Sequence, residues 1–142
     1  MIAFSFIDVE VSGLDMVNVS SWLGSVCKEE MKEVGDINYI FCNDEYLLEI
    51  NRAYLDHDYY TDVITFDYSE GLCLSGDVFV SIERIMENAK NFNVSFLNEL
   101  CRVIVHGMLH LAGYKDKLKD DEQLMRSKED YYLLKYVSRE TF

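Results

Sequence analysis

The sequence predicts a single domain of the α/β (α+β) class, in which a mixed four-stranded sheet is covered by helices. The chain has 142 residues, of which 49% are hydrophobic and 27% charged, so it is long and apolar enough to bury a core. Strand-like and helix-like segments follow one another in the order β-α-β-α-β-β-α-α-α. The chain has no proline and no detectable repeat, which favours one unit over residues 1–142.

Four segments are rich in β-branched and aromatic residues and are bounded by turns or polar loops, which is typical of strands. They are residues 2–7, 37–42, 63–66 and 77–81. A Ser12-Gly13 turn follows the first segment. A polar and aromatic loop over residues 55–62 leads into the third, and a turn over residues 69–71 separates it from the fourth.

Five segments carry apolar residues at spacings of three and four, which predicts helices. They are residues 19–34, 44–54, 82–89, 96–112 and 124–136. Gly35 ends the first helix, Asn43 or Asp44 caps the second, and Ser95 caps the fourth, which Gly113 ends. The apolar residues of the fourth helix cover more than one stripe of its surface, so we expect this helix to be central.

The charge is unevenly distributed along the chain. The 13 basic and 26 acidic residues give a net charge of −13, which by itself disfavours a nucleic-acid partner. Residues 1–100 hold 19 acidic and 5 basic side chains, whereas residues 101–142 hold 7 and 8. The second part of the chain can therefore still bind an anion.

The sequence lacks the usual signals for export, for a membrane span and for cysteine-based sites. The first ten residues carry no base, and no apolar run approaches the length that spans a membrane. We therefore expect a cytoplasmic protein with no membrane partner. The 4 cysteines include no C-x-x-C pair, which excludes a thiolate zinc knuckle and a thioredoxin-like motif.

Two of the 3 histidines, His106 and His110, stand four residues apart on the predicted central helix. At that spacing both imidazoles project from one face and can reach the same metal ion. The spacing alone leaves open an ordinary core or surface pair. Gly113 can turn the chain back toward these rings, which makes Asp116 a candidate third ligand, although a solvated loop carboxylate is the alternative. Three protein ligands would leave a position for water, as in catalytic zinc sites.

The run of residues 106–116, HGMLHLAGYKD, resembles the H-G-x-L-H-L-x-G-Y-D-H signature of the YbeY family of single-strand-specific metallo-endoribonucleases. Lys115 stands in place of the family's Asp, and Asp116 in place of its third His. The family binds zinc through the three histidines. The resemblance therefore implies a catalytic site that holds one zinc ion per chain on His106, His110 and Asp116. Such a donor set also suits iron, manganese or nickel.

A second segment is similar to the family's N-x-x-Y-R-x-x-D-x-P-T-D-V-L-S-F pattern. Residues 51–54 and 61–66 carry the match, and Asp58 takes the place of the intervening Asp. Two departures from this pattern matter. Leu55 replaces an arginine thought to serve the family's RNA chemistry, and Tyr60 replaces the proline.

The resemblance implies an endoribonuclease that processes ribosomal RNA, including maturation of the 16S rRNA 3′ end, and takes part in ribosome quality control. Its implied partners are rRNA and the ribosome or a ribosomal protein, while the oligomeric state stays open. Gly107 stands where zinc peptidases of the H-E-x-x-H type carry their general base, so proteolysis is disfavoured. Two alternatives remain: a metal-dependent hydrolase of another substrate class, and a ribosome assembly factor that lost catalysis with the arginine.

Four positive side chains near the proposed site are expected to contact RNA phosphates, because such contacts dominate nucleic-acid affinity. They are Lys115, Lys117, Lys119 and Arg102, the last one turn before the first histidine. Three tyrosines, Tyr59, Tyr60 and Tyr68, could stack on bases. With 10 tyrosines in the chain, ordinary packing is the simpler interpretation.

Overall fold

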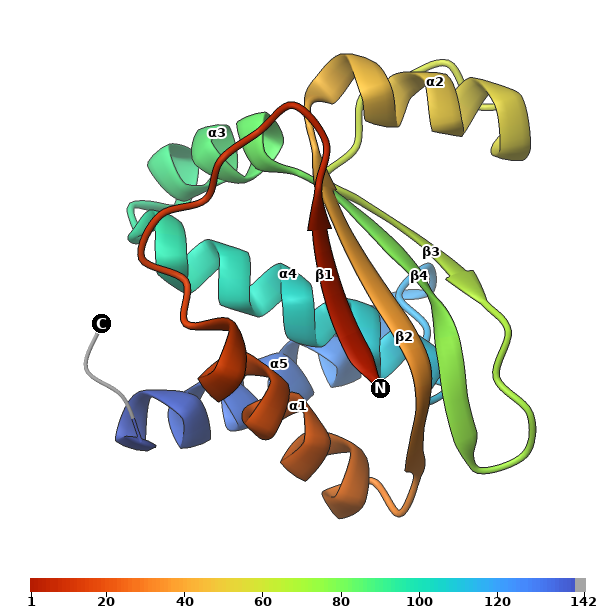
Figure 1. Cartoon of the computed structure of the whole chain (residues 1–142), viewed down its shortest axis with the longest axis vertical. Coiled ribbons are helices and arrows are strands. Elements are labelled where there is room, and N and C mark those ends of the chain that lie inside the picture. The colour runs from red at the N-terminus through yellow and green to blue at the C-terminus, as the bar shows by residue number, and fades with distance from the viewer. Residues whose placement is uncertain (140–142) are drawn as a thin grey trace.

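The computed structural model describes residues 1–139, which form one four-stranded sheet and five helices (Figure 1). In chain order the elements are β1 Ile2–Phe6, α1 Met16–Glu29, β2 Glu33–Cys42, α2 Asp44–Leu55, β3 Val63–Asp67, β4 Cys73–Ser81, α3 Ile82–Phe92, α4 Phe96–Leu111 and α5 Lys119–Arg139. The α+β class and the predicted order of elements are confirmed.

The sheet has the strand order β1-β2-β4-β3. β1 pairs with β2 and β2 with β4 in parallel, whereas β3 pairs with β4 in the antiparallel direction. The sheet is therefore mixed, as predicted. β3 forms one of its edges, and α4 packs beside it, so this edge faces the helix that carries the two histidines.

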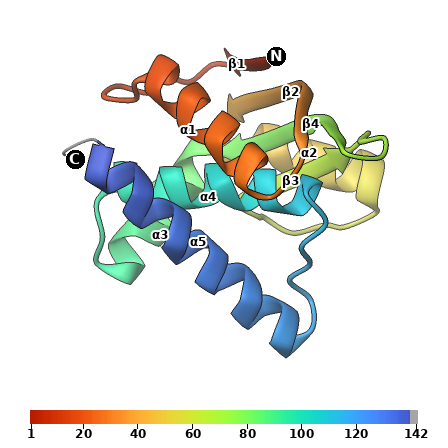
Figure 2. The same ribbon diagram turned by 90° about the horizontal axis from the view of Figure 1, so that it is seen from below.

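Helices cover the two faces of the sheet unequally. Phe41 belongs to the main core, whereas the next residue, Cys42, belongs to a small cluster beneath α2, because successive side chains of a strand point to opposite faces. On the main-core face α4 lies against the sheet, and α5 packs on α4 and crosses it obliquely (Figure 2). Gly107 permits this close approach, because a Cβ there would lie 2.8 Å from Cγ1 of Val78 on β4.

The first helix is shorter than predicted. α1 ends at Glu29, and Met31 adopts a left-handed φ of 60° that turns the chain toward β2. Val34 therefore lies in a strand. Gly35 is not a helix stop but a strand residue pressed against β4, where a Cβ would lie 2.3 Å from Oγ of Ser75. The pairing of β2 with β4 shifts register at this point.

β4 and α5 also begin earlier than predicted. β4 starts at Cys73 rather than at residue 77, and α5 starts at Lys119 rather than at residue 124. α5 is fixed to α1 by Trp22, whose Nε1 donates to the Tyr132 carbonyl at 3.0 Å. Among the residues described, no helix combines the length and apolar character needed to cross a membrane.

Candidate metal centre

The two histidines predicted as metal ligands lie side by side on α4. His106 and His110 are one helical turn apart, and their rings meet edge to face with centroids 4.5 Å apart. Both side chains are partly buried, at 17% and 25% exposure. The imidazoles therefore share a semi-enclosed site that solvent can still reach.

Asp116 is brought back to these rings by the turn after α4. Gly113 has a φ of 108°, in the region that favours glycine, and its N–H donates to the His110 carbonyl at 3.0 Å. Oδ2 of Asp116 then lies 3.2 Å from Nε2 of each histidine. The predicted return of the chain is present, and one donor atom from each of the three residues lies within 4.8 Å of the others.

Hydrogen bonds at the far side of each ring fix which nitrogen faces this group. Nδ1 of His106 donates to Oε2 of Glu129 at 2.6 Å, and Nδ1 of His110 donates to the Tyr114 carbonyl at 2.9 Å. Because both oxygens can only accept, the proton of each neutral ring sits on Nδ1 and the lone pair on Nε2. Partners of this kind orient the imidazoles in metal sites.

The resulting donor set fits a metal ion. With neutral rings, two nitrogen lone pairs and a carboxylate oxygen converge without a hydrogen between them, which a cation would satisfy. Burial lowers the pKa of His106, but the hydrogen bond to Glu129 and the neighbouring carboxylates outweigh it, and the pKa is raised.

Glu129, on α5, was not predicted from the sequence. Its side chain is 6% exposed, and its two oxygens hold His106 and, at 2.9 Å, the Arg102 guanidinium. Arg102 also pairs with Asp130 at 2.6 Å. The guanidinium that we expected to contact RNA is thus engaged by two carboxylates, and it balances the buried charge of Glu129.

Asp62, the residue before β3, lies within electrostatic reach of His106. Burial raises the pKa of its carboxyl, and the charge of nearby His106 partly offsets the rise. Asn88 Nδ2 donates to Oδ2 of Asp62 at 3.4 Å, and the Asp62 carbonyl accepts from the Ser81 N–H at 2.9 Å. Asp62 is therefore braced between α3 and β4 beside the site.

Hydrogen bonds tie Tyr114, in the turn after α4, to the end of α1 and to α5. The Tyr114 hydroxyl donates to Glu30 at 2.6 Å, and the same carboxylate receives the Tyr132 hydroxyl and, at 3.3 Å, Lys128. Burial raises the pKa of Glu30, but these hydrogen bonds outweigh it, and the pKa is lowered. The backbone that holds His110 is thereby tied to two helices.

The segment after α4 and the end of α2 carry the remaining predicted residues. Three lysines, named here the loop lysines, are all exposed: Lys115, Lys117 and Lys119. Leu55, at the position of the family's arginine, is 40% exposed at the end of α2. Arg52 does not stand free in its place, because it is ion-paired with Asp58.

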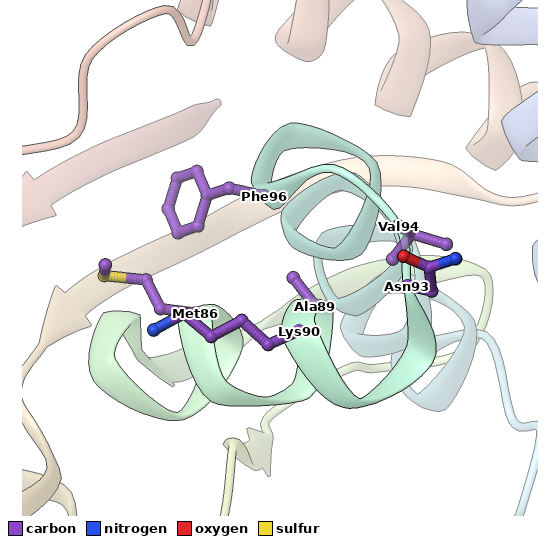
Figure 3. Close-up of a pocket in the computed structure, with 6 residues that line it drawn as sticks. All are labelled: Met86, Ala89, Lys90, Asn93, Val94 and Phe96. Atoms are coloured by element: carbon purple, nitrogen blue, oxygen red, sulfur yellow. The ribbon is translucent and has the colours of Figure 1, made fainter.

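A surface hollow of about 430 Å³ lies at the other end of α4 (Figure 3). Residues of α3 and the start of α4 line it, namely Met86, Ala89, Lys90, Asn93, Val94 and Phe96. Phe96 and His110 are separated by about 21 Å along the helix at 1.5 Å per residue. The hollow is therefore distinct from the candidate metal centre.

Comparisons with known proteins identify the family of this chain. Residues 8–137 match the protein family described as endoribonuclease YbeY. Proteins named endoribonuclease YbeY from Flavobacterium psychrophilum and Parabacteroides distasonis are 55% and 45% identical to this chain, over 92% and 91% of each sequence. The solution structure of a Thermotoga maritima protein superposes with a TM-score of 0.71 at 29% identity, covering 98% of this chain and 91% of that one.

Proposed function

The chain belongs to the endoribonuclease YbeY family, and on that premise we propose that it cleaves single-stranded RNA at a metal centre formed by His106, His110 and Asp116. The observation that supports this assignment most is the convergence of two Nε2 atoms on one carboxylate oxygen, each at 3.2 Å. Two nitrogen donors and one oxygen donor suit zinc, which we propose as the ion, one per chain.

A bound ion of this kind supplies Lewis acidity toward a phosphoryl oxygen and lowers the pKa of a water molecule. The chain's own residues prepare the site. Glu129 and the Tyr114 carbonyl hold the imidazoles with Nε2 inward, and Gly113 returns Asp116 to them. Gly107 carries no side chain and packs against β4, so the helix offers no peptidase-like glutamate.

The loop lysines are the positive groups that we propose to bind the RNA phosphates. They are exposed and flank Asp116 in sequence, whereas Arg102 is held by Glu129 and Asp130. Arg102 thus supports His106, and we assign it an indirect role in RNA cleavage. The acidic body of the protein repels RNA, which confines phosphate contacts to this segment.

We further propose ribosomal RNA as the natural substrate, with cleavage in 16S rRNA 3′ end maturation and in ribosome quality control in the cytoplasm. Family membership supports this proposal. The net charge of −13 adds a physical reason for a ribosomal partner, because a protein with so few phosphate contacts needs help to hold a large RNA. Family membership favours RNA cleavage over the alternatives of another hydrolase substrate and of a non-catalytic assembly factor.

The proposal is tested by incubating zinc-loaded protein with matched single-stranded and duplex RNA of one sequence. We expect cleavage of the single strand alone, and its loss in His110→Ala. Phe92→Ala, at the exposed end of α3, is the matched control and should cleave as the parent does. Cleavage by His110→Ala at the parent rate would show that the metal centre does not take part in the reaction.

A further inference from the structure

Most cations on the α2 and α3 side of the centre are already paired. Arg52 pairs with Asp58, and Arg84 pairs with Asp44 at 2.8 Å. The loop lysines belong to neither helix, because they follow α4 in the chain. An RNA strand that leaves the centre toward α2 therefore needs a contact that does not depend on positive charge.

Exposed aromatic rings occupy this side of the molecule. The loop between α2 and β3 carries His57 and Tyr59, whose rings stack with centroids 5.1 Å apart and planes at 21°. The Tyr59 hydroxyl lies 3.0 Å from Nδ1 of His57, and 55% of Tyr59 is exposed. The two rings thus pack against each other, and more than half of Tyr59 remains exposed to solvent.

A buried asparagine holds this pair in place. Asn51 is 1% exposed, its Nδ2 donates to the Tyr59 carbonyl at 2.9 Å, and its own carbonyl accepts from the His57 N–H at 3.1 Å. Asp56 takes a left-handed φ of 54° to begin the loop. Both stacked residues are therefore fixed to the end of α2 through one side chain and one carbonyl.

The neighbouring tyrosine is used differently. The Tyr60 hydroxyl donates to Glu45 at 2.5 Å, and the Arg84 guanidinium lies over its ring at 5.6 Å. Tyr60 thus joins α2 to α3. By contrast, the described contacts of the Tyr59 ring and hydroxyl are with His57 alone.

Tyr59 is also close in sequence to Asp62, the carboxylate beside the metal centre. It precedes Asp62 by three residues, which limits their Cα separation to about 11 Å, and Asp62 lies within the electrostatic reach of His106. A few nucleotides of single-stranded RNA can bridge such a distance. Base stacking on aromatic rings is the usual charge-independent contact of single-strand binders.

We infer that Tyr59, backed by His57, is a stacking subsite for one unpaired base of the RNA that the metal centre cleaves. The inference rests on the proposed function. It predicts that Tyr59 contributes to substrate binding rather than to the chemical step, because the ring touches a base away from the scissile phosphate. It also predicts a contribution that salt leaves unchanged, since no counterion is released.

The test is a steady-state comparison on one labelled single-stranded RNA. In Tyr59→Ala we expect KM to rise about tenfold, within the range measured for one stacked base, while kcat stays within twofold. The rise should be the same at 50 and 200 mM salt, and Tyr59→Trp should restore the parent KM. Phe92→Ala removes an exposed aromatic residue at the far end of α3 and should leave both constants unchanged.

A base-deleted substrate series identifies the partner of the ring. Abasic substitution at successive positions should raise the KM of the parent at one position beside the cut, and that rise should vanish in Tyr59→Ala. An equal response of parent and variant at every position would overturn the stacking subsite while leaving RNA cleavage intact. A parent that cleaves no single-stranded RNA would overturn the proposed function and this inference together.

Discussion

Replacing Glu129 by Gln tests how the His106 imidazole is oriented. Glu129 is nearly buried and accepts from Nδ1 of His106 at 2.6 Å while its other oxygen holds Arg102 at 2.9 Å. Gln keeps the shape but has only one accepting atom. If its oxygen stays on Arg102, its amide faces Nδ1 and forces the ring proton onto Nε2, where the metal donor must be free.

The expected loss of metal affinity is about 10-fold to 100-fold, the usual effect of removing such a partner, or roughly 1.4 to 2.7 kcal/mol. The assay is calorimetric titration of metal-free protein with zinc, repeated with cobalt to follow the ligand set by absorption. Asp130→Asn is the matched control. It removes the other carboxylate on Arg102 without touching His106, so we expect affinity within twofold of the parent.

A folding control separates the two effects of the substitution. Urea unfolding of metal-free Glu129→Gln measures the stability lost through Arg102, which is distinct from the loss of metal affinity. Zinc affinity equal to the parent in a folded Glu129→Gln protein would refute the orienting role of Glu129. Equal losses in the Gln variant and the Asp130→Asn control would refute it as well.

Four further outcomes are expected. Asp116→His should tighten zinc binding, measured by competition with a chromogenic chelator, because imidazole is the softer donor. Chelation should leave the far-ultraviolet circular dichroism largely unchanged, because the core contains its own apolar contacts and needs no metal. Changing the loop lysines to Glu should weaken RNA binding and flatten its salt dependence in anisotropy titrations, whereas the same change at Lys28 and Lys32 should do little. Glu30→Gln should lower the free energy of unfolding by about 1–3 kcal/mol at pH 7. Because the folded pKa of Glu30 is lowered, this stabilisation is present above the usual value of 4.5, and the difference between urea curves should shrink as the pH falls below it.

The convergence of the three candidate ligands could be predicted from the sequence because it is local. His106, His110 and Asp116 are connected by one helical turn and one glycine-ended turn, whose geometry depends little on the rest of the fold. Glu129 could not be found this way. It stands on another helix, and its place beside His106 depends on how α5 packs on α4.

The predicted boundaries of two helices were wrong because tertiary contacts or polar residues outweighed the apolar spacing. Met31 and Val34 continue the helical spacing of the first helix, but a left-handed turn at Met31 and strand pairing of Val34 decide the structure. The start of α5 was missed because its first turn is polar. Its Asp120, Asp121 and Glu122 favour a helix N-terminus and were a usable signal.

Zinc titration of one metal-free sample, with bound zinc and RNA cleavage followed together, tests the central claim most directly. Native mass spectrometry counts the ions on each chain while a labelled single-stranded RNA reports the rate. If His106, His110 and Asp116 hold the catalytic ion, cleavage should rise in proportion to occupancy and stop rising at one zinc per chain. Full cleavage by the metal-free chain, or a rate that does not follow occupancy of the first site, would contradict the account.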